Sequence, residues 1–148
     1  MTYSNNVPIL YPSVHAVPMK GWRWPNFNPQ EIASHGNGQV LIVPTFLDKL
    51  QFLRNTVGIP LVLTSWYRDP AYNNAVSTTG TKGPHTTGRA VDIAIFGSAA
   101  YNILEHVSPC GFTGVGIKQT GDYKTRYIHL DDLEAEDGFA NRPWLWTY

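Results

Sequence analysis

The sequence contains little cysteine and little charge. Its 148 residues include a single cysteine, Cys110, which excludes an intramolecular disulfide framework and any metal site built from several thiolates. Eleven Lys and Arg residues balance 11 Asp and Glu residues, so the net charge is zero and only 15% of residues are charged. Because proteins that neutralise nucleic-acid phosphates need clustered Lys and Arg, we expect no nucleic-acid partner. Any bound metal must be held mainly by His, Asp or Glu.

Long apolar segments are also missing. No stretch approaches the ~18 apolar residues of a membrane-spanning helix, so we expect no membrane insertion. Residues 1–10 lack the basic region followed by an apolar run that marks a secretory signal peptide. We therefore expect a protein that is made in the cytoplasm without an export signal of its own.

The length and the spread of 13 Gly and 11 Pro suit one domain over residues 1–148. Residues 1–27 are rich in Pro, Asn and aromatic residues, and prolines at this spacing prevent a long helix. Disordered segments are usually poor in aromatic residues. We therefore expect an extended N-terminal arm that is anchored on the core by Trp22, Trp24 and Phe27.

Helical and extended patterns alternate along the rest of the chain. Apolar residues recur at three- and four-residue steps from Pro44 to Gly58, which predicts a helix packed on the core. Asp69 and Ser98 are expected to cap two further helices. The expected strands cover residues 59–65, which we expect to be buried, and residues 90–95, 111–117 and 127–130. Because the order has no βαβ rhythm, we predict an α+β fold with a small, mostly antiparallel sheet flanked by helices.

Three potential metal ligands stand in unusual surroundings. His85 lies in a long loop, Asp92 in the apolar strand after it, and His129 in a second apolar strand. A carboxylate among apolar residues is costly to bury unless it is paired, hydrogen-bonded or bound to a cation. Taken singly, Asp92 could pair with Arg68 or Arg89. His129 could equally be an ordinary core histidine.

The chain has to fold back if His85 and Asp92 are to bind one ion. They are seven positions apart, which is about 23 Å in an extended chain and about 10 Å in a helix. Thr87-Gly88 can supply the turn, because glycine adopts backbone angles closed to other residues.

The later strand presents its polar residues on one face. The side-chain period of two puts His129 and Asp131 on the same face, with Tyr127 beside them. Two histidines, one carboxylate and an open position are typical of a catalytic zinc site on the face of the sheet, as opposed to a closed structural one.

Several segments together resemble the zinc D-alanyl-D-alanine carboxypeptidase and endopeptidase family, over most of the chain from about Phe27 onward. The segments are Ser65-Trp66-Tyr67-Arg68, His85-Thr86-Thr87-Gly88-Arg89-Ala90-Val91-Asp92-Ile93, Gly114-Val115-Gly116-Ile117, Ile128-His129-Leu130-Asp131 and Arg142-Pro143-Trp144-Leu145-Trp146.

The resemblance implies one zinc ion bound by His85, Asp92 and His129. It also implies that Arg68 contacts the substrate carbonyl or terminal carboxylate, a role that suits the fixed fork of a guanidinium. A salt bridge from Arg68 to Asp92 or Asp69 is the alternative. We expect Ser65, Tyr67 and Tyr127 to bind substrate, in a groove also lined by Trp66 and Tyr72, although these aromatic residues could be ordinary core.

The general base departs from the family pattern. Many members have Glu or Asp three residues before the second zinc histidine, where this sequence has Arg126. An arginine cannot be deprotonated in a protein. Asp131 is therefore the first candidate for the base or for the carboxylate that orients His129. Asp122 and Glu105 are weaker candidates; His15 and His106 are expected to be structural or surface residues, and His35 a rim residue.

By this resemblance the chain is a zinc-dependent peptidase, most simply a monomer, that cleaves a peptide bond in bacterial peptidoglycan or muropeptides. A D-Ala-type carboxypeptidase and an endopeptidase both fit. Such a chain could be a phage endolysin released through another protein's pore, or a wall hydrolase of a phage particle. A cytoplasmic dipeptidase is the enzymatic alternative. Because of Arg126, a zinc-stabilised domain that binds peptidoglycan without cleaving it is the non-enzymatic one.

Overall fold

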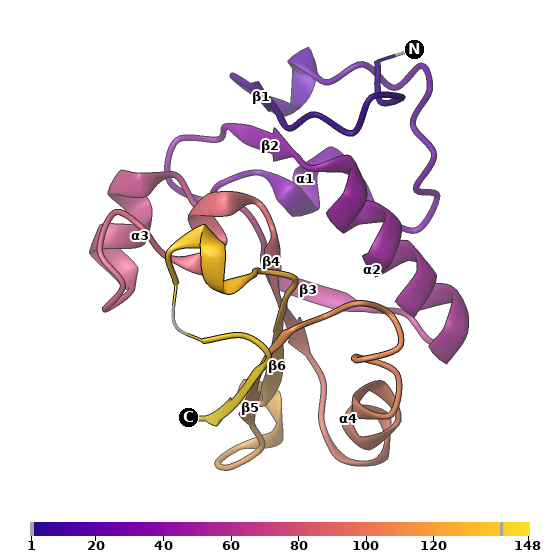
Figure 1. Cartoon of the computed structure of the whole chain (residues 1–148), viewed down its shortest axis with the longest axis vertical. Helices are drawn as coiled ribbons and strands as arrows, with labels where there is room; N and C mark the ends of the chain where they lie inside the picture. Colours follow the sequence, from indigo (N-terminus) through magenta and orange to yellow (C-terminus); the bar gives the residue numbers. More distant parts are fainter. Residues whose placement is uncertain (1, 140) are drawn as a thin grey trace.

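The computed structural model describes residues 2–139 and 141–148, so Met1, where the expected arm begins, and Ala140 lie outside the described residues. Its largest element is a five-stranded sheet of order β3-β4-β6-β5-β7 (Figure 1). All neighbouring strands are antiparallel except β5 and β7. The strands are β3 (Val62–Ser65), β4 (Ala90–Ala94), β5 (Gly114–Lys118), β6 (Tyr127–Asp131) and β7 (Trp144–Thr147). The predicted α+β fold with a mostly antiparallel sheet is confirmed.

Helices accompany this sheet, and a two-stranded sheet lies beside it (Figure 1). The helices are α1 (Pro29–Ile32), α2 (Pro44–Val57), α3 (Pro70–Val76) and α4 (Gly97–Leu104), and short 3-10 turns span Val14–Ala16 (η1), Pro84–Thr87 (η2), Tyr123–Thr125 (η3) and Ala135–Asp137 (η4). Within the described residues, no helix combines the length and the apolar character that crossing a bilayer requires.

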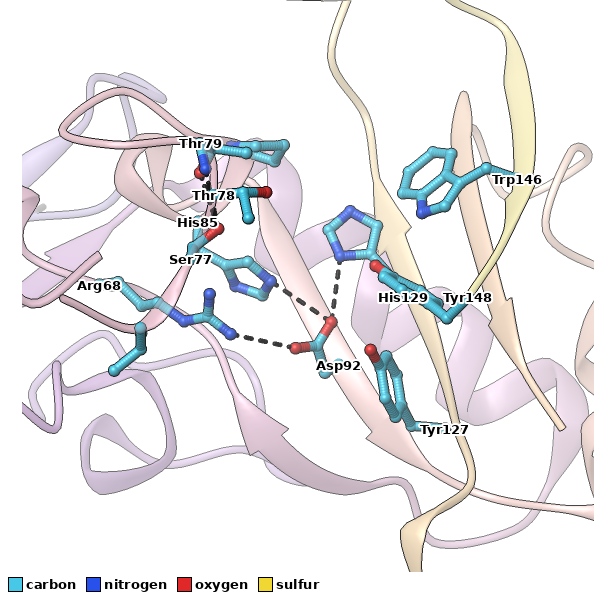
Figure 2. Close-up of a pocket in the computed structure, with 12 residues that line it drawn as sticks. Arg68, Ser77, Thr78, Thr79, His85, Asp92, Tyr127, His129, Trp146 and Tyr148 are labelled. Carbon is cyan, nitrogen blue, oxygen red and sulfur yellow. Dashed lines mark hydrogen bonds and ion pairs between the residues drawn. The ribbon is translucent and has the colours of Figure 1, made fainter. Parts of the chain in front are cut away.

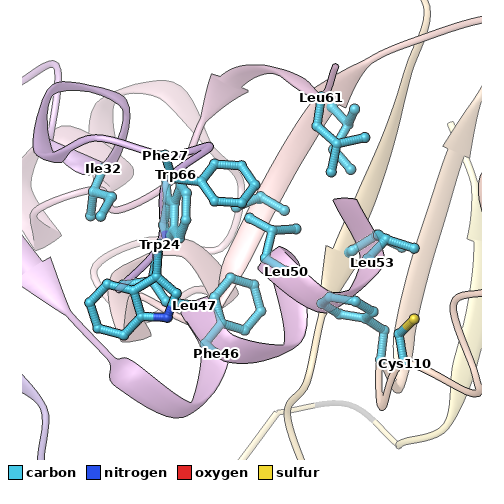
Figure 3. Packing of buried hydrophobic residues seen from close by; sticks show 14 of the residues in the cluster. Trp24, Phe27, Ile32, Phe46, Leu47, Leu50, Leu53, Leu61, Trp66 and Cys110 are labelled. Carbon is cyan, nitrogen blue, oxygen red and sulfur yellow. The ribbon is translucent and has the colours of Figure 1, made fainter. Parts of the chain in front are cut away.

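The two faces of the sheet have different environments. Ile93, Ile128 and Leu130 are fully buried in the hydrophobic core, together with residues of α2 such as Phe46 and Leu50 (Figure 3 shows the α2 side of this core). The alternate residues of β4 and β6 point to the opposite face, because side chains alternate along a strand. That opposite face carries Asp92 and His129, two of the three residues predicted to bind metal.

The helix signals in the sequence were accurate for α2 and α3 but not for α4. Helix α2 begins at Pro44 and ends before Gly58, which has the positive φ of 69° that favours glycine. The predicted serine cap of α4 is wrong, because the helix begins at Gly97 and the residue at its N-cap is Phe96. Ser98 therefore lies inside the first turn.

The predicted burial of residues 59–65 is wrong for most of the segment, in which Leu61 alone is buried. Strand β3 lies at the edge of the sheet and pairs only with β4. Val62 is 60% exposed, because it pairs with Ala94 and so shares the sheet face opposite to that of the buried Ile93. An apolar run by itself does not distinguish an edge strand from a central one.

The N-terminal arm packs against the core. Its strand β1 (Ile9–Tyr11) pairs with β2 (Val40–Ile42) in an antiparallel ribbon. Trp24 and Phe27 are buried, and Trp22 packs edge-on against Trp24 with ring centroids 4.9 Å apart. The three aromatic residues expected as anchors therefore all contact the core or each other.

Asp69 holds the start of α3, the helix that follows Arg68. Its carboxylate accepts hydrogen bonds from the Ser34 hydroxyl (2.6 Å) and from the backbone N–H groups of Asn37 (3.1 Å) and Tyr72 (3.0 Å). The hydrogen bond from Ser34 contributes most to a lowered pKa of Asp69; burial opposes it, and the backbone donors add to the lowering.

We expect Asp69→Asn to destabilise the fold by roughly 1–3 kcal/mol, because an amide cannot accept all three hydrogen bonds. A carboxylate whose pKa is lowered by folding stabilises the protein above its unfolded pKa of about 3.9, and this stabilisation is lost as the pH falls through the folded pKa. The difference between wild type and variant should therefore be largest at neutral pH and shrink below about pH 4.

Urea unfolding at a series of pH values, with a chelator present, measures this difference. Asp122→Asn is the matched control, since Asp122 caps the exposed turn η3 with one backbone hydrogen bond. A pH-independent difference for Asp69→Asn would contradict the assigned role of the carboxylate.

Candidate metal centre and its pocket

The register of the sheet lines up the residues of the candidate site. Asp92 of β4 pairs with His129 of β6, and His129 pairs with Gly116 of β5. The same row continues to Ser65 at one end and to Trp146 at the other. One transverse row of the sheet therefore carries two of the predicted ligands.

His85 reaches this row from the 3-10 turn η2. The turn ends at Gly88, whose φ of 71° confirms the predicted Thr87-Gly88 turn. The Arg68 backbone N–H donates to the His85 carbonyl (3.1 Å), which attaches η2 to the end of β3. His85 is 5% exposed and lies over Asp92.

Three ligand atoms converge at this point (Figure 2). Asp92 Oδ1 lies 3.3 Å from His85 Nε2 and 3.0 Å from His129 Nδ1. All three atoms lie within 4.8 Å of one another. Donors on a tetrahedral zinc ion, at bonds of about 2.0–2.2 Å, are roughly 3.3–3.6 Å apart. The separations therefore suit one ion with small adjustments.

The remaining imidazole nitrogens have fixed acceptors. His85 Nδ1 lies 2.7 Å from the Trp66 carbonyl, and His129 Nε2 lies 2.9 Å from Asp131 Oδ2. A carbonyl and a carboxylate only accept, so these two nitrogens carry the protons. Neutral imidazoles then direct two lone pairs at the Asp92 carboxylate. Such a cluster needs a cation or an extra proton, and the donor set of two imidazoles and one carboxylate fits zinc.

The pKa values of these three residues reflect the same crowding. Burial lowers the pKa of His85. Burial also opposes protonation of His129, but hydrogen bonds to Asp131 and Asp92 outweigh it and raise the pKa of His129. Burial would raise the pKa of Asp92, but hydrogen bonds with the two histidines outweigh it and lower that pKa. The carboxylate of Asp92 is therefore stabilised in its charged form by its neighbours, which include the guanidinium of Arg68 at 3.3 Å.

The converging atoms lie at the floor of a pocket of about 500 Å³. Figure 2 shows hydroxyl-bearing residues of the loop after α3 on one side and aromatic residues on the other. The lining comprises Arg68, Val76, Ser77, Thr78, Thr79, Pro84, His85, Asp92, Tyr127, His129, Trp146 and Tyr148.

Arg68 lies beside the carboxylate of Asp92 in the pocket lining (Figure 2). Its NH2 nitrogen is 3.3 Å from Asp92 Oδ2, and its Nε donates to the Ser65 hydroxyl (3.0 Å). The side chain is 18% exposed and lines the pocket. The salt bridge to Asp92 and access to a ligand therefore coexist, and the two interpretations from the sequence do not exclude each other.

The predicted groove needs correction at Trp66 and Tyr67. They are 2% and 5% exposed, and neither lines the pocket. Trp66 packs edge-on against Phe27 and Phe46, as in Figure 3. Both rings belong to the hydrophobic core, so they do not contribute to the pocket. Tyr72 is also absent from the pocket lining.

Of the other two residues predicted to bind substrate, Tyr127 lies in the pocket lining and Ser65 does not. Tyr127 lines the pocket, and burial, with Tyr148 and Asp92 nearby, raises its pKa. Its phenol therefore stays protonated at neutral pH and can donate a hydrogen bond. Ser65 does not line the pocket and instead holds Arg68.

Asp131 is fully buried, and its carboxylate does not line the pocket. Arg126 contacts the Gly121 carbonyl at 2.9 and 3.1 Å and lies away from the cluster. The weaker base candidates Asp122 and Glu105 are exposed outside the pocket, as is His15, and His106 and His35 do not line it. Asp92 is the one carboxylate among the lining residues.

Trp146 and Tyr148 form the aromatic side of the pocket with Tyr127, and neither was predicted from the sequence to line it. The Gly-x-Gly pattern of β5 could have indicated it. A Cβ on Gly116 would lie 2.6 Å from the Trp146 indole, and a Cβ on Gly114 would clash with the Asp131 carboxylate. Gly116 therefore leaves room over the strand for the indole of Trp146, and Gly114 leaves room for the carboxylate of Asp131.

Comparison with known proteins gave one match. A protein-family model described as Peptidase M15 matches residues 25–131, which include every element from α1 to β6. Searches of curated proteins and of solved structures found no match.

Proposed function

The chain belongs to the peptidase M15 family, a metallopeptidase family of the zinc D-alanyl-D-alanine carboxypeptidase type, and we propose that it hydrolyses a peptide bond in bacterial peptidoglycan. The substrates would be stem peptides or cross-links of the wall. The observation that carries this proposal is the convergence of His85 Nε2, Asp92 Oδ1 and His129 Nδ1 on the floor of an open pocket. A buried structural zinc site would instead be closed by a fourth protein ligand.

His85, Asp92 and His129 would hold one zinc ion. Zinc, when bound, supplies Lewis acidity, which polarises a carbonyl oxygen and acidifies a coordinated water. The protein's own contribution is to hold both imidazoles in one tautomer through the Trp66 carbonyl and Asp131.

The pocket walls would bind and orient the peptide. Arg68 would donate to the carbonyl oxygen under attack or to a terminal carboxylate, because its guanidinium is charged and faces the pocket. Tyr127 would donate its phenolic proton to a second substrate oxygen. Trp146 and Tyr148 offer apolar area to the stem peptide, opposite the hydroxyl groups of residues 77–79.

For Asp131, the geometry supports the orienting role over the role of general base. Both of its oxygens are engaged, with His129, Arg142 and the Leu133 N–H, and the side chain is inaccessible to solvent. A base must reach the proton that it removes within about 3 Å or through one water. We therefore propose that Asp131 orients His129 and takes no proton from substrate or water.

The lack of a second carboxylate in the pocket lining favours one other candidate function. A domain with the ligands but without a base would bind peptidoglycan and leave it intact. Turnover distinguishes the two functions. We expect the zinc-loaded protein to release fragments from purified muropeptides, detected by mass spectrometry, and a chelator to abolish this release. Intact muropeptides with zinc retained would contradict the peptidase proposal and favour the binding domain.

The biological setting is a further part of the proposal. We propose that the chain acts as a single domain and a monomer, as a phage endolysin or as a hydrolase of a phage particle. The compact core that joins the N-terminal arm to the sheet supports one domain. Digestion of purified peptidoglycan sacculi by the added protein tests the lytic role. Gel filtration of the purified protein tests whether it is a monomer.

A further inference from the structure

The carboxylate that orients His129 is itself held by one side chain, Arg142. Arg142 Nε donates to Asp131 Oδ1 (2.8 Å) and its NH2 group donates to Oδ2 (2.9 Å). The Arg142 side chain is 4% exposed and that of Asp131 is 0% exposed. The guanidinium therefore forms a two-point ion pair with both oxygens of a carboxylate that is not exposed to solvent.

This ion pair, together with two further contacts, fixes the orientation of the Asp131 carboxylate. Oδ2 also faces His129 Nε2, and Oδ1 also accepts from the Leu133 N–H (3.3 Å). A guanidinium is always charged, so the carboxylate that it contacts on both oxygens is ionised. The carboxylate is thus an acceptor only, and His129 must direct Nδ1 toward Asp92.

Arg142 also contacts the aromatic side of the pocket. Its guanidinium carbon lies 5.4 Å from the centroid of the Trp146 ring, and that ring is 5.1 Å from the His129 ring. His129 therefore contacts Asp131 through Nε2 and the tilted ring of Trp146, and Arg142 contacts both of these neighbours.

We propose that Arg142 is a positioning residue: through Asp131 it fixes the orientation of His129 as a metal ligand, and Trp146 packs beside the same imidazole ring. Arg142 does not line the pocket and lies C-terminal to the residues that match the family model. The proposal rests on the proposed zinc site, but it does not require that the site cleave peptidoglycan.

Metal affinity tests the proposal without substrate. We expect Arg142→Gln to weaken zinc binding about 10- to 100-fold, the usual effect of losing a group that supports a metal ligand. Competition with a chromophoric chelator measures the affinity. In the cobalt-substituted protein, the d–d absorption spectrum should also change, because it reports ligand geometry. Arg142→Lys should recover the affinity only in part, since an ammonium restores the charge but not the two-point ion pair.

Arg89 provides the matched control. Its Nε donates to Asp132 Oδ1 (2.8 Å) and its NH2 group donates to the Asp132 carbonyl (2.7 Å), next to Asp131 in sequence but without contact to a ligand histidine. We expect Arg89→Gln to lower thermal stability in chelator while leaving zinc affinity and the cobalt spectrum unchanged. Because Arg142→Gln leaves Asp131 buried without its cation, Arg142→Lys takes over the test if the glutamine variant does not fold.

A double-mutant cycle with Asp131→Asn tests whether Arg142 acts on His129 through Asp131. If Arg142 acts through Asp131, the double variant should bind zinc about as weakly as Asp131→Asn alone. Folded Arg142 variants with wild-type affinity and spectrum would overturn the proposal, as would losses that simply add. A wild-type protein that binds zinc but cleaves no muropeptide would instead contradict the peptidase proposal and leave this one standing.

Discussion

His129→Ala should abolish zinc binding and reduce muropeptide hydrolysis by at least about 10³-fold, because the metal supplies several kcal/mol of transition-state stabilisation. The variant removes one of three ligand atoms that converge within 4.8 Å. It also leaves Asp92 with His85 as its one imidazole partner. Metal content by elemental analysis should fall from one zinc per chain to near zero.

His15→Ala is the control for this variant. His15 is an exposed histidine in η1, remote in sequence from the ligands and absent from the pocket lining. It should leave zinc content and hydrolysis at wild-type levels. Circular dichroism and thermal melts in chelator separate a folding defect from loss of metal. Full activity of a folded, zinc-free His129→Ala protein would refute the metal site.

Arg68→Gln should lower kcat/KM by roughly 10²–10³-fold while zinc remains bound, the usual loss when a donor to a developing oxyanion is removed. The reason is the position of the guanidinium, beside Asp92 and facing the pocket. Arg68→Lys should be intermediate, because it keeps the charge without the fixed fork. Steady-state kinetics on defined muropeptides give the values.

The partition between kcat and KM adds information on what Arg68 contacts. A fall in kcat would indicate a contact made mainly in the transition state, and a rise in KM alone would indicate uniform binding, as expected for a terminal carboxylate. Arg126→Gln is the matched control, since Arg126 contacts the Gly121 carbonyl away from the pocket. If Arg68→Gln kept wild-type kinetics, the salt bridge to Asp92 would be its only role.

Local pattern was sufficient for several features. The period of apolar residues and the flanking Pro44 and Gly58 determine α2 without reference to the rest of the chain. The same holds for the Thr87-Gly88 turn that returns His85 toward the strand of Asp92. An acidic residue inside an apolar strand also stands out locally, because its burial needs compensation.

Burial and neighbourhood were harder to predict. Apolar runs look alike in edge and central strands, so the exposure of Val62 followed only from the position and register of β3 in the sheet. Tyr67 looked like a groove residue because aromatic side chains suit both cores and binding sites. Its burial depends on which neighbours pack against it, and these lie far away in sequence.

By itself the sequence limited the chemistry of the site: with one cysteine, the ligands of any metal had to be mainly histidine and carboxylate, and the resemblance to the zinc carboxypeptidase family implied that His85, Asp92 and His129 bind zinc. The parallel pairing of β7 with β5 then determined which side chains surround the ligands. That pairing brings Arg142 to Asp131 and Trp146 to His129. Contacts between segments this far apart depend on strand order and register, which local sequence does not encode, because they are set by the packing of the whole core.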